Sequence, residues 1–147
     1  MHEGVHVKDN QEEKDMSEWR RVVVTGLGAV TPVGNNVSET WNSLKNGKNG
    51  IAPITFFDTE GFKAKLAAEV KGFEPKEYLE VNEILRTDRY AQLAVAAAAQ
   101  AVEDSGIEGK VEPEKFGVMF GTGIGGIGTF EVEHTKLLEK GPRRVSS

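Results

Sequence analysis

The sequence predicts an α/β protein. Two short runs, Val22–Val24 and Phe116–Phe120, are continuously apolar and are followed by glycines, which is typical of strands buried on both faces of a parallel sheet. Between them lies an alanine-rich stretch with the composition of a buried helix. The expected order is strand, helix, loop, helix, strand, helix, and this alternation is characteristic of α/β folds.

Residues 1–18 are polar and show no periodicity, so they are expected to form a disordered leader. Residues 1–19 contain six acidic residues and two lysines, which accounts for four of the five net negative charges of the chain. His2 and His6 are spaced i, i+4 in this leader, but a metal pair is not expected where no fold holds them. Order is expected to begin near Arg20.

The first expected strand stops at the glycines of residues 25–28, and a turn follows at residues 32–35. Asn36 and Glu39 have the spacing of a capping box, and Gly47 is a suitable C-terminal stop, so a helix is predicted between them. One face of this helix carries the apolar side chains Val37, Trp41 and Leu44.

The next segment, residues 48–83, has weak patterns. Phe56, Phe57 and Phe62 surround Asp58 and Gly61, which suggests an ordered loop, and residues 66–70 are expected to form a short strand.

The clearest helix is predicted over residues 82–105, ended by Gly106. Its middle is rich in alanine, so another element can approach it closely, and residues 93–102 are apolar enough to be buried. Its first turns are charged, through Glu83, Arg86, Asp88 and Arg89.

A last helix, lying on the surface, is predicted over residues 129–140 and is stopped by Gly141 and Pro142, with Phe130, Leu137 and Val132 facing inward. Two convincing strands and one doubtful one leave the edges and faces of a parallel sheet uncovered. The sequence therefore predicts that more chain, or a partner, completes the fold.

Composition excludes several classes of protein. Residues 20–147 are nearly neutral, which argues against a nucleic-acid partner, and no apolar run is long enough to span a membrane. The start of the chain lacks the pattern of a secretory signal. The chain has no cysteine, which rules out disulfides and zinc–thiolate sites within it. A cytoplasmic location is expected.

Residues 121–126 match G-x-G-x-x-G after an expected strand, which raises the hypothesis of a dinucleotide-binding turn. That turn belongs near the start of a βαβ unit with an acidic residue at the end of the next strand. Here the strand comes late, and the following acidic residues lie in an expected helix. Close approach of the backbone to another surface is the favoured role of these glycines.

No catalytic constellation is found. His134 is the single histidine after the leader, no G-x-S-x-G is present, and the carboxylates are scattered over helix faces and the leader. His134 is therefore expected to lie on a helix surface or to serve in packing, and no metal site is expected. Arg86 and Arg89, spaced i, i+3, are either ordinary surface charges or a docking point for an acidic partner. Arg143 and Arg144 form a second small basic cluster.

Residues 20–147 resemble the N-terminal third of the type II β-ketoacyl-acyl-carrier-protein synthases, the condensing enzymes of fatty-acid synthesis. The order and spacing of several motifs carry this resemblance: R-R-V-V-V-T-G-L-G-A-V-T-P-V-G-N, E-T-W, F-F-D-T, D-R-Y-A-Q, E-D-S-G-I, G-T-G-I-G-G-I-G and E-H-T-K-L-L-E-K-G-P-R-R-V-S. The resemblance implies a thiolase-like fold of layered αβαβα type, incomplete in this chain. Residues 19–147 are interpreted as the first portion of its N-terminal domain, truncated before the nucleophile.

The resemblance also implies a decarboxylative Claisen condensation without a cofactor. The partners would be acyl-carrier protein bearing acyl and malonyl thioesters, and a second copy of the full-length enzyme. The catalytic cysteine and two histidines would lie beyond Ser147, so this chain holds none of the catalytic residues and is expected to be inactive alone.

Secondary site residues are carried over by position. Ile124 matches the position that lines the acyl pocket, within the glycine-rich loop of Gly121, Gly123, Gly125 and Gly126. Arg86 and Arg89 lie near the helix start that offers basic residues to carrier protein, although Leu85 and Thr87 interrupt the cluster. The alternative is a non-catalytic acyl- or partner-binding module that pairs with a separate C-terminal chain.

Overall fold

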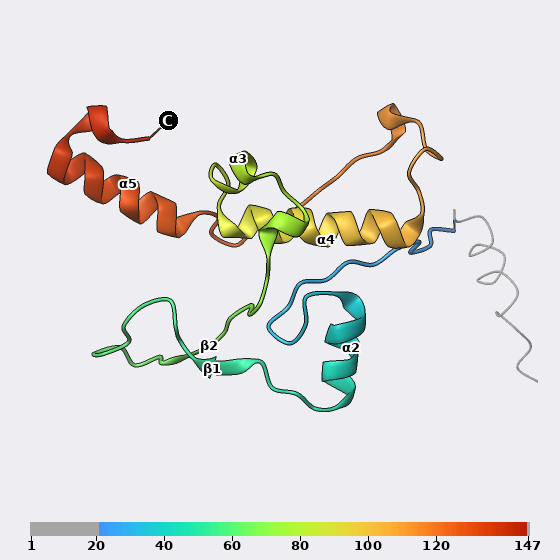
Figure 1. The fold of residues 1–147 in the computed structure, drawn as a ribbon, viewed down its shortest axis with the longest axis horizontal. Coiled ribbons are helices and arrows are strands. Elements are labelled where there is room, and N and C mark those ends of the chain that lie inside the picture. The colour runs from blue at the N-terminus through green and yellow to red at the C-terminus, as the bar shows by residue number, and fades with distance from the viewer. Residues whose placement is uncertain (1–20, 147) are drawn as a thin grey trace, which may run out of the picture.

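The computed structural model of the chain describes residues 21–146 (Figure 1). The expected leader, His2, His6 and Arg20 therefore lie outside the described residues. The main elements are α2 (Val37–Lys45), β1 (Ile51–Pro53), β2 (Leu66–Ala68), α3 (Val81–Ile84), α4 (Arg89–Ser105) and α5 (Ile127–Lys140). Single 3₁₀ turns occur at η1 (Pro75–Glu77), η2 (Pro113–Lys115) and η3 (Pro142–Arg144). No helix in this part of the chain is long and apolar enough to cross a membrane.

Helix α4 is the central element, and the segment that precedes α2 runs along it (Figure 1). The backbone amide of Leu27 donates to Asp104 at 2.9 Å, and that of Ala29 donates to Gln100 at 3.1 Å. A Cβ on Gly26 or Gly28 would overlap the helix backbone at residues 97–105. The close approach that the alanines predict is therefore made by these two glycines.

The expected helix after residue 35 is confirmed as α2. Asn36 is its N-cap and accepts a 2.8 Å hydrogen bond from the amide of Glu39. The Glu39 carboxylate accepts from Asn35 instead of from the cap residue, so the reciprocal bond lies one residue earlier than in a regular capping box. Trp41 and Leu44 on its apolar face are exposed in the described structure.

The strand expected at residues 66–70 is confirmed over residues 66–68 as β2. It pairs antiparallel with β1, which the sequence did not indicate, in the register Ile51 to Ala68. Beyond β2, the buried carboxylate of Glu69 accepts hydrogen bonds from the amide and the hydroxyl of Thr55, at 2.9 and 2.7 Å. These bonds lower the pKa of Glu69, because they stabilise its ionised form.

The prediction of one helix over residues 82–105 is wrong in its first turns. The chain forms α3, leaves the helical conformation, and starts again at Arg89 with Asp88 as an extended N-cap. The buried side-chain amide of Gln92 donates to the carbonyls of Ile84 and Thr87, at 3.1 and 2.9 Å. Gln92 thus satisfies carbonyls that the break would otherwise leave open. The predicted stop at Gly106 is confirmed by its left-handed conformation.

The two apolar runs predicted as buried strands do not form strands in the described structure. Val22 is 90% and Met119 is 96% exposed, and neither run pairs with another described segment. A parallel strand is stable only when neighbouring strands pair with it and helices cover its faces. Residues 21–146 supply neither, so the runs remain unpaired, although their sequences are those of strands.

The expected burial of α4 and α5 is only partly observed. Ala96 is fully buried, whereas Val95 on α4 is exposed, although a buried helix was predicted over residues 93–102. Helix α5 begins two residues before the expected start and ends at Gly141 as expected. Its predicted inward residues Phe130, Val132 and Leu137 are exposed, because no described element covers them.

Candidate functional site

The glycine-rich loop lies against the first turns of α4. A cavity of about 110 Å³ is enclosed between Tyr90 and Ala94 of the helix and residues 120–122 of the incoming chain. The loop then turns and enters α5 at Ile127. Figure 1 shows the start of α5 next to the N-terminal end of α4. The candidate site is therefore this junction of loop and helix ends.

A local turn sets the shape of the loop. The amide of Gly125 donates a 3.1 Å hydrogen bond to the hydroxyl of Thr122. Gly125 has φ +74°, a left-handed conformation that disfavours residues with a Cβ. Ile124 lies inside this turn, and its side chain is 77% exposed. The turn thus leaves the Ile124 side chain uncovered by the described residues.

The expected close approach of the loop backbone is made at its last position. A Cβ on Gly126 would overlap the carboxylate of Asp88. At Gly121 and Gly123 a Cβ would meet no atom within 4 Å in the described structure. Only the Gly126 end of the loop is therefore held tightly by described residues.

Asp88 joins the two helix ends. It is the N-cap residue of α4, and its carboxylate also accepts a hydrogen bond from the hydroxyl of Thr129 in the first turn of α5. In the sequence, Asp88 stands out only as one of the charges at the helix start. Its position before a helical run is a recognisable N-cap signal, but the partner 41 residues away has no signal in the sequence.

A groove of about 730 Å³ lies beside this contact, between residues 85–88 and residues of α5 with Ser146. Glu133 lines it and accepts hydrogen bonds from the Lys136 ammonium at 2.6 Å and the Ser146 amide at 2.7 Å. These two bonds, led by that from Lys136, lower the pKa of Glu133 to about 2. Arg86 and Asp88 line the opposite wall of the same groove, so that wall carries one charged group of each sign.

The two arginines predicted as a pair have different surroundings. Arg89 donates a 3.1 Å hydrogen bond to the carbonyl of Val70, and its guanidinium lies 5.9 Å from the ring centre of Phe56 and 5.6 Å from that of Phe73. The side chain of Arg86 is exposed and makes no hydrogen bond or ion pair within residues 21–146. Arg89 is thus occupied in holding a loop, and Arg86 is available at the surface.

The second basic cluster lies at the other end of α5. Arg144 of η3 lines a groove of about 590 Å³ together with Lys136 and Lys140. Lys136 is already paired with Glu133 at its edge.

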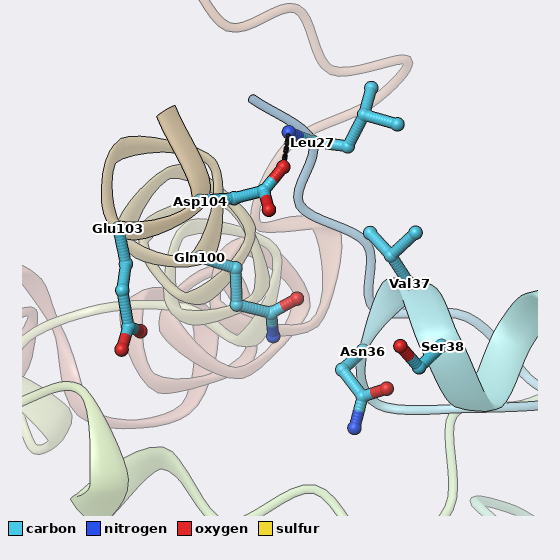
Figure 2. A pocket seen from close by; sticks show the side chains of 7 residues that line it. All are labelled: Leu27, Asn36, Val37, Ser38, Gln100, Glu103 and Asp104. Atoms are coloured by element: carbon cyan, nitrogen blue, oxygen red, sulfur yellow. Dashed lines mark hydrogen bonds between the residues drawn. The ribbon is translucent and has the colours of Figure 1, made fainter. Parts of the chain in front are cut away.

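A second cavity, of about 410 Å³, lies between α2 and the end of α4 (Figure 2). Figure 2 shows the Asp104 carboxylate pointing to the amide of Leu27, with Gln100 and Glu103 beside it on the helix. Asp104 and Gln100 both accept from the backbone of residues 27–29, so these polar groups serve the packing of that segment.

No nucleophile and base are brought together in the described chain. His134 stacks its ring on Phe130 of the same helix, with the ring centres 5.9 Å apart. Within residues 21–146 no group of three or more histidine, aspartate or glutamate residues is arranged to hold a metal ion. The site therefore offers a shaped loop, an anchoring carboxylate and an exposed arginine.

Comparisons with known proteins identify the family of the chain. Residues 19–147 match the family model described as β-ketoacyl synthase, N-terminal domain. The chain is 45% identical over 132 residues to 3-oxoacyl-[acyl-carrier-protein] synthase 2 of Staphylococcus aureus (strain COL), covering 89% of this chain and 32% of that protein. It is 46% identical over 130 residues to the protein of the same name from Coxiella burnetii (strain RSA 493 / Nine Mile phase I), covering 88% and 31%.

Solved structures give the same picture. The ishigamide ketosynthase/chain length factor is 34% identical with a TM-score of 0.67, over 87% of this chain and 32% of that one. A β-ketoacyl synthase from Burkholderia phymatum STM815 is 27% identical with a TM-score of 0.68, over 88% and 32%. The chain thus spans about a third of the length of the relatives that it matches.

Proposed function

The chain belongs to the β-ketoacyl synthase family, and we propose that it provides the N-terminal part of a 3-oxoacyl-[acyl-carrier-protein] synthase. The observation that carries this proposal is the identity of 45–46% over nearly the whole chain with synthases of that name. The reaction is the decarboxylative condensation of an acyl thioester with malonyl-acyl-carrier protein, which extends a fatty-acid chain. It takes place in the cytoplasm, in a homodimer of the full-length enzyme.

The chemical steps belong to residues outside this chain. A cysteine thiolate accepts the acyl group from carrier protein, loss of CO₂ from the malonyl thioester gives a carbanion, and that carbanion attacks the acyl-cysteine to release the thiolate. Two histidines assist these steps. Since the 147 residues contain no cysteine, the chain alone is inactive.

The contribution of this chain to the reaction is the wall of the acyl pocket. Ile124 stands 77% exposed on the turn made by Thr122 and Gly125, which supports a role in which its side chain meets something outside residues 21–146. In the complete enzyme that contact is the acyl chain. Gly121 and Gly123, with open space around them, leave room for the surfaces that close this pocket.

Docking of carrier protein falls to Arg86 more than to Arg89. Carrier proteins are acidic, and an exposed guanidinium attracts them through charge–charge interaction that salt weakens. Arg86 has no ionic partner among the described residues, whereas Arg89 is held by Val70, Phe56 and Phe73. Arg89 stabilises the chain beside the docking point.

The exposed apolar runs support the view that other parts of an enzyme cover this chain. Val22–Val24 and Phe116–Phe120 present large apolar side chains to solvent, and exposed patches of this kind mark surfaces that are buried in an assembly. The same observation favours the alternative, in which a separate C-terminal chain covers these runs and the assembly binds acyl groups without condensing them.

A chimera tests the proposal. Residues 1–147 are joined to the part of the Coxiella burnetii synthase that follows the matched region, and condensation of acyl-carrier protein with malonyl-carrier protein is measured. The chimera is expected to condense, and the chain alone is expected not to. A folded, dimeric chimera that binds acyl-carrier protein but forms no product, beside an active Coxiella burnetii enzyme, would favour the binding module.

A further inference from the structure

We propose that Asp88 is a positioning residue for the glycine-rich loop, and that through this loop it sets the acyl chain length that the enzyme accepts. The inference concerning chain length rests on the function proposed above for Ile124. The positioning of the loop by Asp88 rests on contacts within the described chain alone.

Asp88 is itself held firmly at the start of α4. Its carbonyl accepts hydrogen bonds from the amides of Ala91 and Gln92, at 3.0 and 3.1 Å. The buried side chain of Gln92 ties the residues just before it to the same helix. The backbone from which the Asp88 carboxylate projects is therefore fixed from both sides.

The carboxylate of Asp88 reaches the other helix through both of its oxygens. Oδ1 accepts from the hydroxyl of Thr129, and Oδ2 lies where a Cβ of Gly126 would be. Gly126 is the N-cap residue of α5, and its carbonyl accepts from the amide of Phe130 at 3.0 Å. A negative charge beside the first turn of a helix is favourable, because the free amides there carry partial positive charge. The hydrogen bond from Thr129, the close packing against Gly126 and the favourable charge all act at the same contact, between Asp88 and the start of α5.

Ile124 lies two residues before Gly126, where this contact begins. The turn closed by Thr122 and Gly125 fixes Ile124 relative to Gly126, but that turn is internal to the loop and does not hold it on the helix. At Gly121 and Gly123 a Cβ would meet no described atom, and residues 120–122 reach α4 only across the cavity beside Tyr90 and Ala94. The bond between Asp88 and Thr129 is thus the described hydrogen bond that ties the end of this loop to α4.

The effect of Asp88 on the loop can be separated from the effects of the neighbouring charged and polar groups. Arg86 and Thr87 line the groove from the same side, and Glu133 lines it from α5. Glu133 is engaged with Lys136 and Ser146, so it does not compete for Thr129. Asp88→Asn keeps the size of the side chain and removes its charge, and Thr129→Val removes the donor while Thr129→Ser keeps it.

The first measurement is amide hydrogen exchange in the 147-residue chain. Thr129→Val, which removes the donor, is expected to speed exchange at residues 125–130 roughly tenfold through the loss of a hydrogen bond to a charged group. Asp88→Asn keeps an acceptor oxygen but removes the charge, so it is expected to speed exchange in the same region by a smaller factor, and Thr129→Ser is expected to resemble the parent. Asp104→Asn is the matched control, because Asp104 is an aspartate near the other end of α4 that also accepts a distant bond. It should leave exchange at residues 125–130 unchanged.

The second measurement is the ratio of condensation rates with long and short acyl chains in the chimera. Asp88→Asn and Thr129→Val are expected to change this ratio in the same direction, Asp88→Asn by the smaller factor, with no change in the double variant beyond that of Thr129→Val, while Asp104→Asn and Thr129→Ser leave it unaltered. A general loss of stability would lower both rates together and would not alter their ratio.

Unchanged exchange at residues 125–130 in both Thr129→Val and Asp88→Asn would overturn the positioning role. Faster exchange with an unaltered chain-length ratio in an active chimera would overturn the role in chain-length selection. If exchange were faster in the variants but the parent chimera did not condense, the proposed function of the chain would be wrong. The positioning of the loop by Asp88 would still be supported.

Discussion

The backbone amide of Ala29 donates a hydrogen bond to the side-chain oxygen of Gln100, 3.1 Å away, in the middle of α4. One turn further along the helix, Asp104 accepts from the amide of Leu27 in the same way. Gly26 and Gly28 alternate with these donors and face the helix backbone. The segment is therefore bound to α4 through its main chain, which requires glycine at these positions.

Gly28→Ala is predicted to destabilise the chain. Its Cβ would overlap the carbonyl of Ala97, which is part of the helix backbone and cannot move aside as a side chain can. Overpacking of this kind costs about 1–3 kcal/mol in the free energy of unfolding. Urea unfolding of the two proteins measures the difference.

The matched control for that variant is Gly117→Ala, because a Cβ there meets no atom within 4 Å of the described chain. It is expected to change the free energy of unfolding by less than about 1 kcal/mol, through the unfolded state. Equal effects of the two substitutions would show that contact with α4 does not determine the need for glycine at position 28.

The two arginines near the start of α4 are predicted to respond differently to substitution. Arg89→Ala removes a hydrogen bond to Val70 and two ring contacts, with an expected loss of about 2 kcal/mol in the free energy of unfolding. Arg89→Lys should recover only part of this, because lysine lacks the planar group that stacks on rings. Urea unfolding of each variant provides the values.

Arg86→Ala should change stability by less than about 0.5 kcal/mol, because its side chain is exposed and free of partners within residues 21–146. In the chimera it should weaken the binding of acyl-carrier protein, and more so at low salt than at high salt. If Arg89→Ala weakened this binding at unchanged stability, and Arg86→Ala did not, the assignment of docking to Arg86 would be wrong.

Local signals in the sequence predicted much of the fold correctly. Asn36 before an apolar periodic run located α2, and Gly106 and Gly141 located the ends of α4 and α5. Each of these signals acts within one turn of the backbone, so it can be identified without knowledge of the rest of the chain. The family was also predicted correctly from the motifs, since the β-ketoacyl synthase family model matches residues 19–147.

The errors concern side-chain contacts and strand pairings that residue spacing does not reveal. The break before Arg89 depends on Gln92 reaching back to Ile84 and Thr87, and a buried glutamine on an alanine-rich helix gives no sign of this in the sequence. The runs at residues 22–24 and 116–120 have strand sequences but no described partner strand. The contact of Asp88 with Thr129 spans 41 residues and could not be predicted from spacing.

Stability is predicted to fall in acid through Glu133. Its pKa is about 2 in the folded chain, compared with an ordinary value of 4.5, because Lys136 and the Ser146 amide bind the ionised form. A lowered pKa stabilises the folded state above pH 4.5, and this contribution is lost progressively as the pH falls from about 4.5 toward 2. Glu69, whose pKa is also lowered, acts in the same direction.

Melting temperatures measured between pH 2 and 7 provide this test. Glu133→Gln should reduce the fall in melting temperature between pH 4.5 and 2. Glu114 is an exposed glutamate on η2, and Glu114→Gln should leave this fall as in the parent. An acid limb that is the same in all three proteins would show that the bonds to Lys136 and Ser146 do not persist in solution.

Ile124→Phe is predicted to shift the complete enzyme toward short acyl chains. If Ile124 lines the acyl pocket as proposed, the larger ring on the turn of Thr122 and Gly125 takes the space that a long chain needs, while a short chain still fits. Loss of one or two methylenes of space in an apolar pocket changes relative rates by roughly 10- to 200-fold. The rates of the chimera with short and long acyl-carrier proteins give the ratio directly. Leu138→Phe is the control, because Leu138 is similarly exposed, at 72%, but lies on α5 away from the turn. If Ile124→Phe left the ratio as it is in the parent and in Leu138→Phe, Ile124 would not line the acyl pocket, and the exposed turn would have to serve another surface of the enzyme.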